Sequence, residues 1–531
     1  MFVDARSVLT NTVVECDICI IGAGAAGITL AREFSGQEFR VCLLEGGGLE
    51  FDAATQSLYQ GKNTGAHKIE LDTERMRYFG GTTNLWGGYC RPLDEEDFEE
   101  RDWVPNSGWP FRRTELEPYY ERAHRLCQLG PFNYDIDAWN SDDKNCFINN
   151  GRLVTKFFQL VPTKPDDLRR FGSVYRDDIQ SSPNITTYLY ANVTSILQSP
   201  NGTSITNARI NTISGSEWSV SARIFILATG AIENARLLLL SRDTQNTGIG
   251  NAYDLVGRYF LAHLELQAGI FVPSPQTSMQ YFQNPNGKCR SKKINWGGKA
   301  VPILTLCEEL RRQYKLVNFT AELEPFSLRL ASGVESFHQL AQSIRDRRMP
   351  EDLITQVGRI LADSGDVAAA IYRKMRGEEL RVKVYSLKNA SETVPNPNSR
   401  VTLSRETDQF NRNRVVLNWE ISPIDTDSLQ RGYEIVGQEL GLSGLGRLKT
   451  SISEISHDKG TYWSQHHHMG TTRMHVDPKK GVVNANCQVY GVSNLFIAGS
   501  SVFPTSGSAT PTLTIVALAI RLADHIKGKM K

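Results

Sequence analysis

Two groups of residues in this chain could do chemistry. The first is the glycine-rich turn Gly22-Ala23-Gly24-Ala25-Ala26-Gly27, and the second is a run of three histidines, His466–His468. In a G-x-G-x-x-G turn the first glycine allows a tight bend, the second lets the backbone approach a pyrophosphate, and the third lets helix and strand pack closely. The turn therefore predicts a dinucleotide site.

The residues on either side of the turn support this prediction. Asp17–Ile21 is expected to be a short apolar strand, Ile28–Phe34 a helix, and Arg40–Leu44 a second strand. The N-terminus of that helix would meet the phosphate charge. Glu45 follows the second strand at about the 20-residue interval typical of an acidic residue that accepts hydrogen bonds from ribose hydroxyls. These features predict a dinucleotide without choosing between NAD and FAD.

The three histidines allow three interpretations. In an extended segment His467 faces one side while His466 and His468 face the other, so the three could not share one metal ion. A second interpretation is core or surface histidines without a chemical role. The third is a proton acceptor, because the pKa of histidine lies near working pH. We expect no metal site.

The elements that must position these residues divide into two kinds. We predict an α/β fold with a discontinuous Rossmann-like domain over residues 1–263 and 457–531, containing a parallel sheet and a small β-meander. Residues 264–456 are predicted to form an α+β domain on an antiparallel sheet, with a helical insertion near residues 335–377, while residues 71–130 form a loop and helical segment. The meander is expected from four short strands: Ile185–Tyr190, Ser195–Leu197, Ala208–Ile213 and Trp218–Val220.

Two later strands are expected to reach the same crevice. Arg223–Ala228 is a continuous apolar run, as expected for a buried parallel strand, and it ends in the small-residue turn Ala228-Thr229-Gly230. Leu495–Ala498 is a second apolar strand, followed by Gly499, Ser500 and a helix over Thr512–Ile526. Both turns could lie against a dinucleotide bound at the glycine turn.

The composition excludes several classes of protein. Lys and Arg (59) nearly balance Asp and Glu (58), for a formal charge of +1, so neither nucleic acid nor an anionic membrane is an expected partner. No apolar run approaches the roughly 20 residues that span a bilayer, and no signal peptide is recognised. The nine cysteines are scattered and are expected to be free thiols, which favours a cytoplasmic location.

Several longer stretches resemble the glucose–methanol–choline (GMC) oxidoreductase family, most closely its bacterial sugar- and alcohol-oxidising branch, with similarity to pyranose oxidase near the C-terminus. They occur in family order over nearly the whole chain. They include YFGGTTNLWGGYCRPLDEEDF, ILATGAIENARLLL, DLVGRYFLAHL, HHHMGTTRM and VYGVSNLFIAGSSVFPTSGSATPTLTIVALAIRLADHI. The resemblance implies that the dinucleotide is FAD and that residues 264–456 form the substrate-binding domain.

The resemblance also implies which residues contact FAD. Relatives that bind FAD covalently carry His just before the Trp of the corresponding loop, where this chain has Leu85, so non-covalent FAD is expected. Trp86 could cover the flavin ring or be a buried structural residue. The full set of expected FAD contacts is Gly22, Gly24, Ala25, Ala26, Gly27, Glu45, Gly81, Thr82, Asn84, Leu85, Trp86, Val193, Ala228, Gly230, Gly499, Ser500 and Thr512.

The resemblance assigns the catalytic base by position. The family places its His three residues before the Gly of a G-T-x-x-M segment, here Gly470, which makes His467 the counterpart and His468 the alternative. A second His or Asn normally precedes the Pro-Thr of the last helix, and here that residue is Thr510. Threonine could orient a substrate alkoxide as a weak donor but could not act as a base.

The expected function is transfer of a hydride from the C–OH carbon of a sugar, glycoside or other alcohol to flavin N5, with His467 as proton acceptor. Thr510 and Leu85 keep an alternative open, namely a specialised flavoenzyme that performs another oxidation or a rearrangement. A flavin-binding protein without catalysis is the third hypothesis. The partners expected are a small-molecule substrate and an electron acceptor, which could be oxygen, a quinone or another carrier. Substrate identity and oligomeric state stay open.

Overall fold

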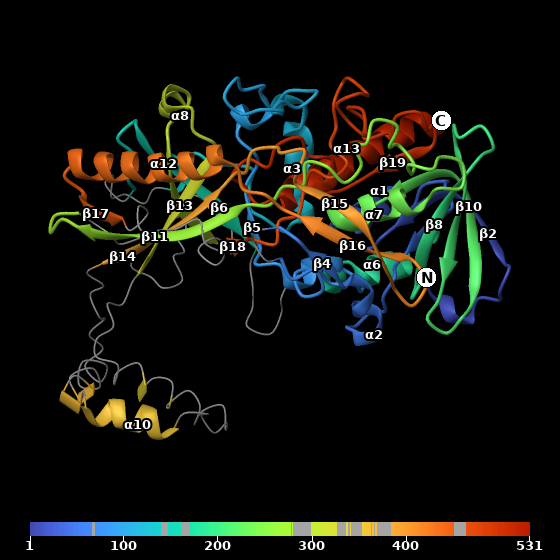
Figure 1. The fold of residues 1–531 in the computed structure, drawn as a ribbon, viewed down its shortest axis with the longest axis horizontal. Coiled ribbons are helices and arrows are strands. Elements are labelled where there is room, and N and C mark those ends of the chain that lie inside the picture. Colours follow the sequence, from blue (N-terminus) through green and yellow to red (C-terminus); the bar gives the residue numbers. More distant parts are fainter. Residues whose placement is uncertain are drawn as a thin grey trace.

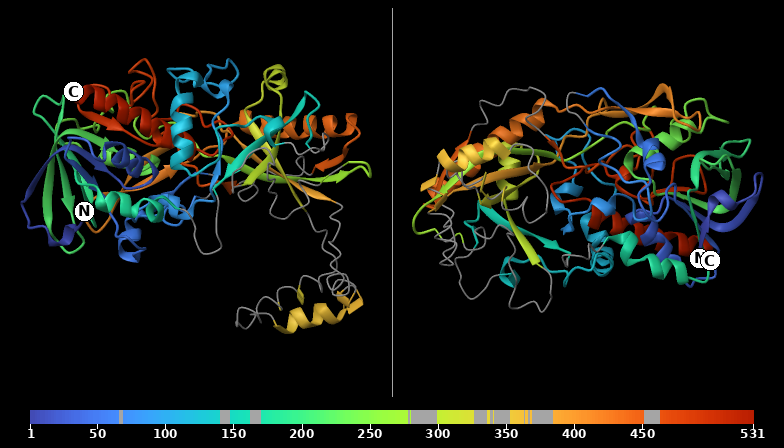
Figure 2. Two further views of the ribbon diagram at one scale, coloured as in Figure 1. Left: turned by 180° about the vertical axis from the view of Figure 1, so that it is seen from behind. Right: turned by 90° about the horizontal axis from the view of Figure 1, so that it is seen from below.

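The structure, a computed structural model, shows a chain built on two large sheets and one small sheet (Figure 1). It describes residues 1–65, 69–139, 147–161, 170–277, 299–325, 353–362, 384–450 and 463–531, with a few single residues and pairs between 279 and 368. Both termini lie at the end of the molecule that the first sheet forms (Figure 2). The α/β fold with a parallel sheet, a meander and a separate antiparallel sheet is confirmed.

The first sheet is mainly parallel. Its strand order is β1-β7-β3-β2-β10-β9-β8, and β19 pairs with the C-terminal part of β10. β8, β9 and β10 pair antiparallel, and the other neighbours pair parallel. The strands are β1 (Phe2–Asp4), β2 (Val13–Ile21), β3 (Val41–Leu44), β7 (Ile185–Leu189), β8 (Asn192–Gln198), β9 (Ile205–Asn211), β10 (Glu217–Leu227) and β19 (Leu495–Ile497).

Two expectations about this sheet are wrong in detail. The segment 185–190 was expected in the meander, but β7 pairs parallel with β3, so the antiparallel meander consists of β8, β9 and β10. The two strands expected at 218–220 and 223–228 are one strand, β10. Ser221 and Ala222, which suggested a break, pair with Glu15 and Cys16 of β2, because a long partner strand keeps the hydrogen-bond ladder continuous through small residues.

The second sheet is antiparallel and has the order β17-β11-β14-β13-β12-β6-β5, with β18 beside β11. Two of its strands, β5 and β6, come from the chain before residue 264, so the division of the chain into the expected domains stays a prediction. The strands are β5 (Tyr89–Cys90), β6 (Leu153–Leu160), β11 (Leu264–Pro273), β12 (Lys299–Leu306), β13 (Phe319–Pro325), β14 (Tyr385–Ser391), β17 (Gly446–Thr450) and β18 (Trp463–Ser464).

The third sheet has three strands, β15 (Arg400–Thr407), β16 (Asn413–Asn418) and β4 (Gly61–Asn63). In Figure 1 it lies between the two larger sheets. Of the helical insertion expected near 335–377, α10 (Leu353–Ala362) is described, and most of the remainder lies outside the described residues.

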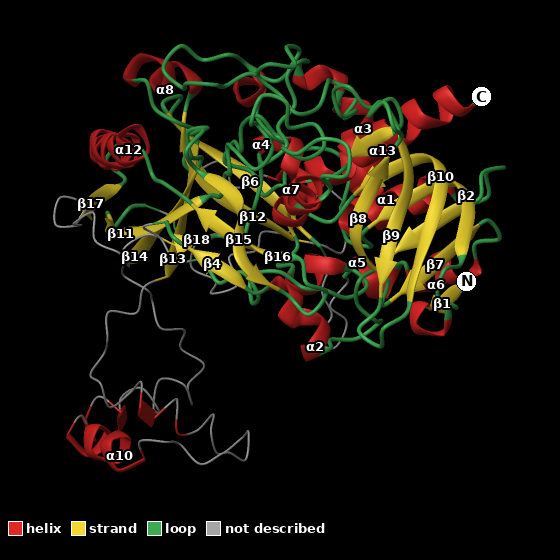
Figure 3. Cartoon of the chain, turned by 45° about the vertical axis from the view of Figure 1, so that its right-hand side comes forward, coloured by secondary structure: helices red, strands yellow, loops and turns green. Residues whose placement is uncertain are grey.

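Long helices cover the sheets. α13 (Thr512–Met530) packs against α1 (Ala25–Phe34) and α3 (Glu117–Leu126) beside the first sheet. α12 (Pro423–Leu442) lies over the second sheet (Figure 3) and begins with a capping box between Ser422 and Asp425. The remaining helices are α2 (Ala53–Gln56), α4 (Ile136–Trp139), α5 (Phe171–Val174), α6 (Arg176–Ser181), α7 (Ala231–Leu240) and α8 (Glu308–Tyr314).

Candidate functional site

A cavity of about 360 Å³ opens at the carboxyl ends of β2, β10 and β19. The glycine turn lies at one of these strand ends, and Ala228 and Ala498 lie at the other two. Ligands of open α/β sheets bind at the carboxyl ends of parallel strands, so this cavity is the expected place for a dinucleotide. We call it the nucleotide cavity.

The glycines of the turn fit a dinucleotide for two different reasons. A Cβ on Gly22, whose φ is +104°, would lie 2.6 Å from the Ala228 carbonyl oxygen, and a Cβ on Gly27 would collide with the Gly22 carbonyl. A Cβ on Gly24 would meet nothing closer than Gly81 Cα at 4.0 Å and would extend along the cavity wall. Gly22 and Gly27 therefore permit the tight packing of the turn, while Gly24 leaves room for a ligand.

Three helix N-termini supply the positive side of this cavity. α1, α7 and α13 begin after Gly24, Gly230 and Pro511, and none of these residues caps its helix with a side-chain hydrogen bond. All three line the cavity. The first N–H groups of a helix have no partner within the helix and carry the positive end of its dipole. The cavity is thus suited to the anionic groups of a dinucleotide.

Glu45 lies at the far side of the turn and is buried. Its two carboxylate oxygens accept hydrogen bonds from the backbone N–H groups of Ala23 and Gly47, each at 3.0 Å. Burial raises the pKa of Glu45, although these backbone bonds oppose the shift. Because a carboxylate oxygen can accept more than one bond, Glu45 can also hold ribose hydroxyls.

The structure brings most of the expected cofactor residues to this one cavity. Gly27 and Asn84 do not line it: Gly27 packs within the turn, and Asn84 is buried and donates to the Phe79 carbonyl oxygen at 3.0 Å. The expected residues that do line it are Gly22, Gly24, Ala25, Ala26, Glu45, Gly81, Thr82, Leu85, Trp86, Val193, Ala228, Gly230, Gly499, Ser500 and Thr512.

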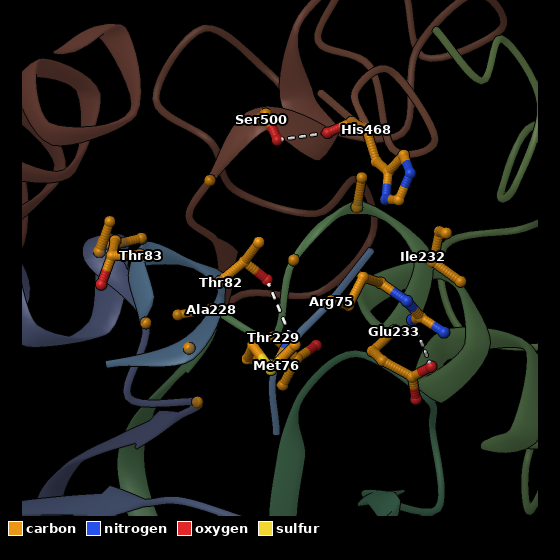
Figure 4. A pocket seen from close by; sticks show the side chains of 18 of the residues that line it. Arg75, Met76, Thr82, Thr83, Ala228, Thr229, Ile232, Glu233, His468 and Ser500 are labelled. Atoms are coloured by element: carbon orange, nitrogen blue, oxygen red, sulfur yellow. Dashed lines mark hydrogen bonds and ion pairs between the residues drawn. The ribbon is translucent and has the colours of Figure 1, made fainter. Parts of the chain in front are cut away.

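Sequence reasoning missed a polar pair on the same wall. Arg75 and Glu233 form a buried ion pair, with 2.9 Å between Arg75 Nη1 and Glu233 Oε1, and face each other in Figure 4. Burial alone would raise the pKa of Glu233, but Arg236 and Arg75 lower it overall. The signal was available, since Arg75 and Arg77 lie just before the predicted FAD loop. Neither residue type nor spacing indicated a buried partner.

A second cavity, of about 420 Å³, adjoins the nucleotide cavity. It lies against the second sheet, with Phe158 of β6, Thr320 of β13 and Ala390 of β14 in its lining. We call it the second cavity. The residues that line both cavities, and so form the wall between them, are Trp86, Gly87, Gln465, His466, His467 and Thr512.

His467 is held in this shared wall by a histidine that sequence reasoning missed. The segments around Leu261 and Met469 pair antiparallel, which places His263 opposite His467. Their Nδ1 atoms are 2.9 Å apart. His263 lay in one of the stretches that resemble the family, but nothing in the sequence indicated that it would contact His467.

The hydrogen bonds of this pair assign its protons. The Ser506 carbonyl oxygen, 3.4 Å from His263 Nε2, can only accept, so we place the ring proton of His263 on Nε2. Burial lowers the pKa of His263 to about 4, so the ring is neutral and its Nδ1 accepts. His467 then donates from Nδ1, which leaves the lone pair of its Nε2 free to accept a proton.

Burial also lowers the pKa of His467 well below its usual 6.5, and the neighbouring histidines His263, His468 and His466 lower it further. The imidazole is therefore neutral at ordinary pH. His467 is partly buried, and its remaining exposure lies at a wall lined by both cavities.

The other two candidate catalytic residues have different surroundings. His468 lines the nucleotide cavity but not the second cavity, and its Nε2 is 3.1 Å from Glu74 Oε2. Thr510 lines the second cavity, and its hydroxyl donates to the Tyr89 carbonyl oxygen at 2.6 Å. With its proton directed to Tyr89, Thr510 offers lone pairs to the cavity rather than the donor expected from the sequence.

Among the residues that the structure describes, no group of three or more His, Cys, Asp or Glu side chains is placed to hold a metal ion. Nor is any helix in the described ranges both long and apolar enough to cross a membrane. The described cysteines are free thiols, and all but Cys307 are buried.

Comparisons with known proteins agree with this architecture. A family model described as GMC oxidoreductase matches residues 395–519. The chain is 23% identical to 6'''-hydroxyparomomycin C oxidase of Streptomyces lividus, over 97% of this chain and 92% of that protein. It is 22% identical to 2-methyl-1,2-propanediol dehydrogenase of Mycolicibacterium austroafricanum, over 98% and 97% of the two chains. The crystal structure of pyridoxine 4-oxidase from Mesorbium loti has a similar fold, with a TM-score of 0.55, 17% identity, and coverage of 97% and 99%.

The fold and the paired cavities define a nucleotide-dependent oxidoreductase. This chain belongs to the GMC oxidoreductase family, as its sequence motifs predicted. It is an FAD-dependent oxidoreductase that acts on CH–OH donors.

Proposed function

We propose that this enzyme removes a hydride from a C–OH carbon of a sugar, glycoside or other alcohol, with His467 as the proton acceptor. The observation that supports this most strongly is the position of His467 in the wall between the two cavities, with its Nδ1 2.9 Å from His263 Nδ1. A base must come within hydrogen-bond reach of the proton it removes, and this wall is open to a substrate in the second cavity.

FAD supplies the hydride-accepting atom when it is bound. The glycine turn and the N-terminus of α1 would hold its pyrophosphate, and Glu45 its ribose. The loop residues Gly81, Thr82 and Trp86 would contact the flavin end, since they line the nucleotide cavity on the side of the shared wall.

The chain's own part in the reaction is proton transfer. The substrate hydroxyl gives its proton to Nε2 of His467, while its carbon loses a hydride to the cofactor, and the product is a carbonyl. His263 is a positioning residue: by accepting from Nδ1 it directs the lone pair of His467 Nε2 toward the second cavity. Thr510 can accept a hydrogen bond from another hydroxyl of the substrate.

The N-terminus of α13 contributes electrostatically. Thr512, its first residue, lies in the shared wall, and the helix has no side-chain cap. Its free N–H groups place positive partial charge where negative charge accumulates during hydride transfer.

We also propose that FAD is bound without a covalent bond. Leu85 lines the nucleotide cavity and is 45% exposed, and a leucine side chain has no nucleophilic atom that could bond to the flavin. Acid precipitation of the holoenzyme should therefore release all the flavin into the supernatant. Flavin that stays with the pellet would contradict this mode of binding.

Anaerobic flavin bleaching tests the proposed reaction. The holoenzyme would be mixed with a panel of sugars, glycosides and simple alcohols without oxygen, and the visible spectrum followed. We expect at least one alcohol to bleach the flavin and to appear as the matching carbonyl product. Bleaching by none of them would overturn the proposal. Admission of oxygen then distinguishes an oxidase, in which the oxidised spectrum returns quickly, from a dehydrogenase, in which it does not.

Thr510 supports one alternative, a different oxidation or a rearrangement on the same fold, because its hydroxyl proton is directed away from the cavity. If that alternative holds, Thr510→Asn should gain alcohol oxidation that the natural enzyme lacks. Unchanged or reduced activity in Thr510→Asn would count against it.

A further inference from the structure

The second cavity has an acidic floor made by one face of the second sheet. Alternation along β13 sends Thr320, Glu322 and Glu324 to the cavity, while Phe319 lies on the opposite face against Gly432 of α12. Lys388 of β14 is directly opposite Glu322, and Glu265 of β11 is directly opposite Ala390 of β14. The sheet thereby presents three carboxylates and one ammonium group to the cavity.

The single lysine is already paired. Lys388 Nζ is 2.9 Å from Glu265 Oε1, and Gln465 donates to the other oxygen of Glu265 at 2.8 Å. Glu322 and Glu324 form no ion pair or hydrogen bond with any other part of the chain that the structure describes. A partly buried carboxylate without a partner is unfavourable, and two of them side by side repel each other.

The surroundings of Glu322 reflect this missing cation. Burial raises the pKa of Glu322 to about 7, Glu324 and Glu265 raise it further, and Lys388 lowers it. A positively charged group on a ligand would meet two carboxylates that nothing else in the described chain neutralises.

A buried hydroxyl in the same cavity points independently to a ligand. Ser508 lines the second cavity and is 3% exposed, and its Oγ has no hydrogen-bond partner among the described residues. Buried hydroxyls are nearly always hydrogen-bonded, so an unpaired one at a cavity wall suits a polar ligand. On another wall, the rings of Tyr89 and Phe158 meet edge to face and offer an apolar surface.

The acidic floor is close to the proposed proton acceptor. Gln465, which holds Glu265, precedes His467 by two residues, so their Cα atoms lie within about 7 Å of each other. A molecule of monosaccharide size can therefore reach from the shared wall to the floor of the same cavity.

We propose that the second cavity binds a hydroxylated substrate that carries a protonated amine, such as an amino sugar or another amino alcohol, with the ammonium group between Glu322 and Glu324. This inference rests on the proposed function, because it names the substrate class for the same site. The hydroxyl group to be oxidised lies at His467, and the ammonium group at the floor.

Matched sugars test it by activity. The holoenzyme would be reduced anaerobically by D-glucosamine, D-glucose and N-acetyl-D-glucosamine, which differ in charge at one position. We expect the second-order rate constant for flavin reduction to be at least tenfold higher for D-glucosamine than for either neutral sugar. The double variant Glu322→Gln/Glu324→Gln should remove that advantage and leave the neutral sugars unchanged within about twofold.

The control variant is Glu38→Gln, which removes the same charge from an exposed position that lines neither cavity. It should keep the preference for D-glucosamine. Equal rates for charged and neutral sugars in the natural enzyme would overturn the proposal, as would a double variant that retains the preference.

A binding measurement separates this inference from the proposed function. Cyclohexylamine has no hydroxyl group to oxidise, and cyclohexanol is its neutral counterpart. By calorimetry with the holoenzyme, we expect cyclohexylamine to bind at least tenfold more tightly than cyclohexanol, and the double variant to bind both equally. If no alcohol bleaches the flavin but this amine preference is found, the oxidation is wrong and the amine site stands. If neutral alcohols bleach the flavin and the amine preference is absent, the amine site is wrong and the oxidation stands.

Discussion

The two cavities that meet at His467 are built from different parts of the chain. The nucleotide cavity is lined largely by backbone and small residues, among them the glycine turn and the N-termini of α1, α7 and α13. The second cavity is lined by long side chains, such as Glu322 and Lys388, which project from neighbouring strands of an antiparallel sheet.

This difference explains how specific each cavity is. Backbone N–H groups and glycines recognise what all dinucleotides share, the pyrophosphate and its close approach to the chain. Side chains on a sheet can change one at a time without disturbing the strands, so they can be matched to one substrate. A substitution in the nucleotide cavity should affect folding or cofactor content, and one in the second cavity should affect substrate choice.

The largest effect is expected from Gly27→Ala compared with Gly24→Ala. A Cβ on Gly27 collides with the Gly22 backbone, so this variant should lose about 3 kcal/mol or more of unfolding free energy and its flavin. A Cβ on Gly24 has 4.0 Å of space, so Gly24→Ala should keep its stability within about 1 kcal/mol while its flavin content falls. Urea unfolding of the apoprotein and flavin absorbance measure the two effects. Equal destabilisation by both substitutions would contradict the distinction.

A smaller effect is expected at His263. His263→Leu removes the acceptor for His467 Nδ1 and should slow flavin reduction by about 10- to 100-fold without loss of bound flavin. His263→Asn keeps an acceptor near the Nδ1 position and should recover most of the rate. A purely structural role would give no such rescue, so equal rates in the two variants would exclude positioning. Stopped-flow reduction by a fixed alcohol measures both.

The smallest effect is a pH dependence limited to amine substrates. The groups that face Glu322 are Glu324 on its own strand, Lys388, Glu265 and Tyr89. Since the pKa of Glu322 is about 7, its carboxylate is ionised above that pH and protonated below it. The kcat/KM ratio of D-glucosamine to D-glucose should therefore fall by several-fold as pH drops from 8 to 6.

Glu322→Gln provides the comparison for this profile. The kcat/KM ratio in that variant should stay flat over the same pH range, because the neutral amide does not titrate. A ratio that changes with pH in the same way in both proteins would place the titrating group elsewhere.

The sequence was most informative where function depends on backbone shape. The Gly22–Gly27 turn, Glu45 and the small residues after β10 and β19 all reach one cavity, because the ends of parallel strands must meet at one edge of the sheet. Asn84 was expected in the same cavity but is buried beside Phe79, since a loop residue's direction is set by its hydrogen bonds and not by its position in a motif.

Contacts between distant segments could not be predicted. His263 and His467 are brought together by antiparallel pairing of two irregular segments, and Glu322 and Lys388 by the register of β13 and β14. Strand register depends on the packing of the whole sheet, and without it no pattern in the sequence links these residues. The same holds for Thr510, whose neighbour Tyr89 comes from β5.

The most direct test of the proposed chemistry compares His467→Ala with His468→Ala in single-turnover flavin reduction by a saturating alcohol. Both histidines line the nucleotide cavity, but only His467 also lines the second cavity. His475→Asn is the matched control, since His475 lines neither cavity and asparagine can still accept the Asp477 N–H bond. With flavin still bound, His467→Ala should reduce the rate by about 10²- to 10⁴-fold, and His468→Ala by less than tenfold. A His467→Ala enzyme that reduces its flavin at the natural rate, beside a slow His468→Ala enzyme, would contradict the assignment of His467 as proton acceptor.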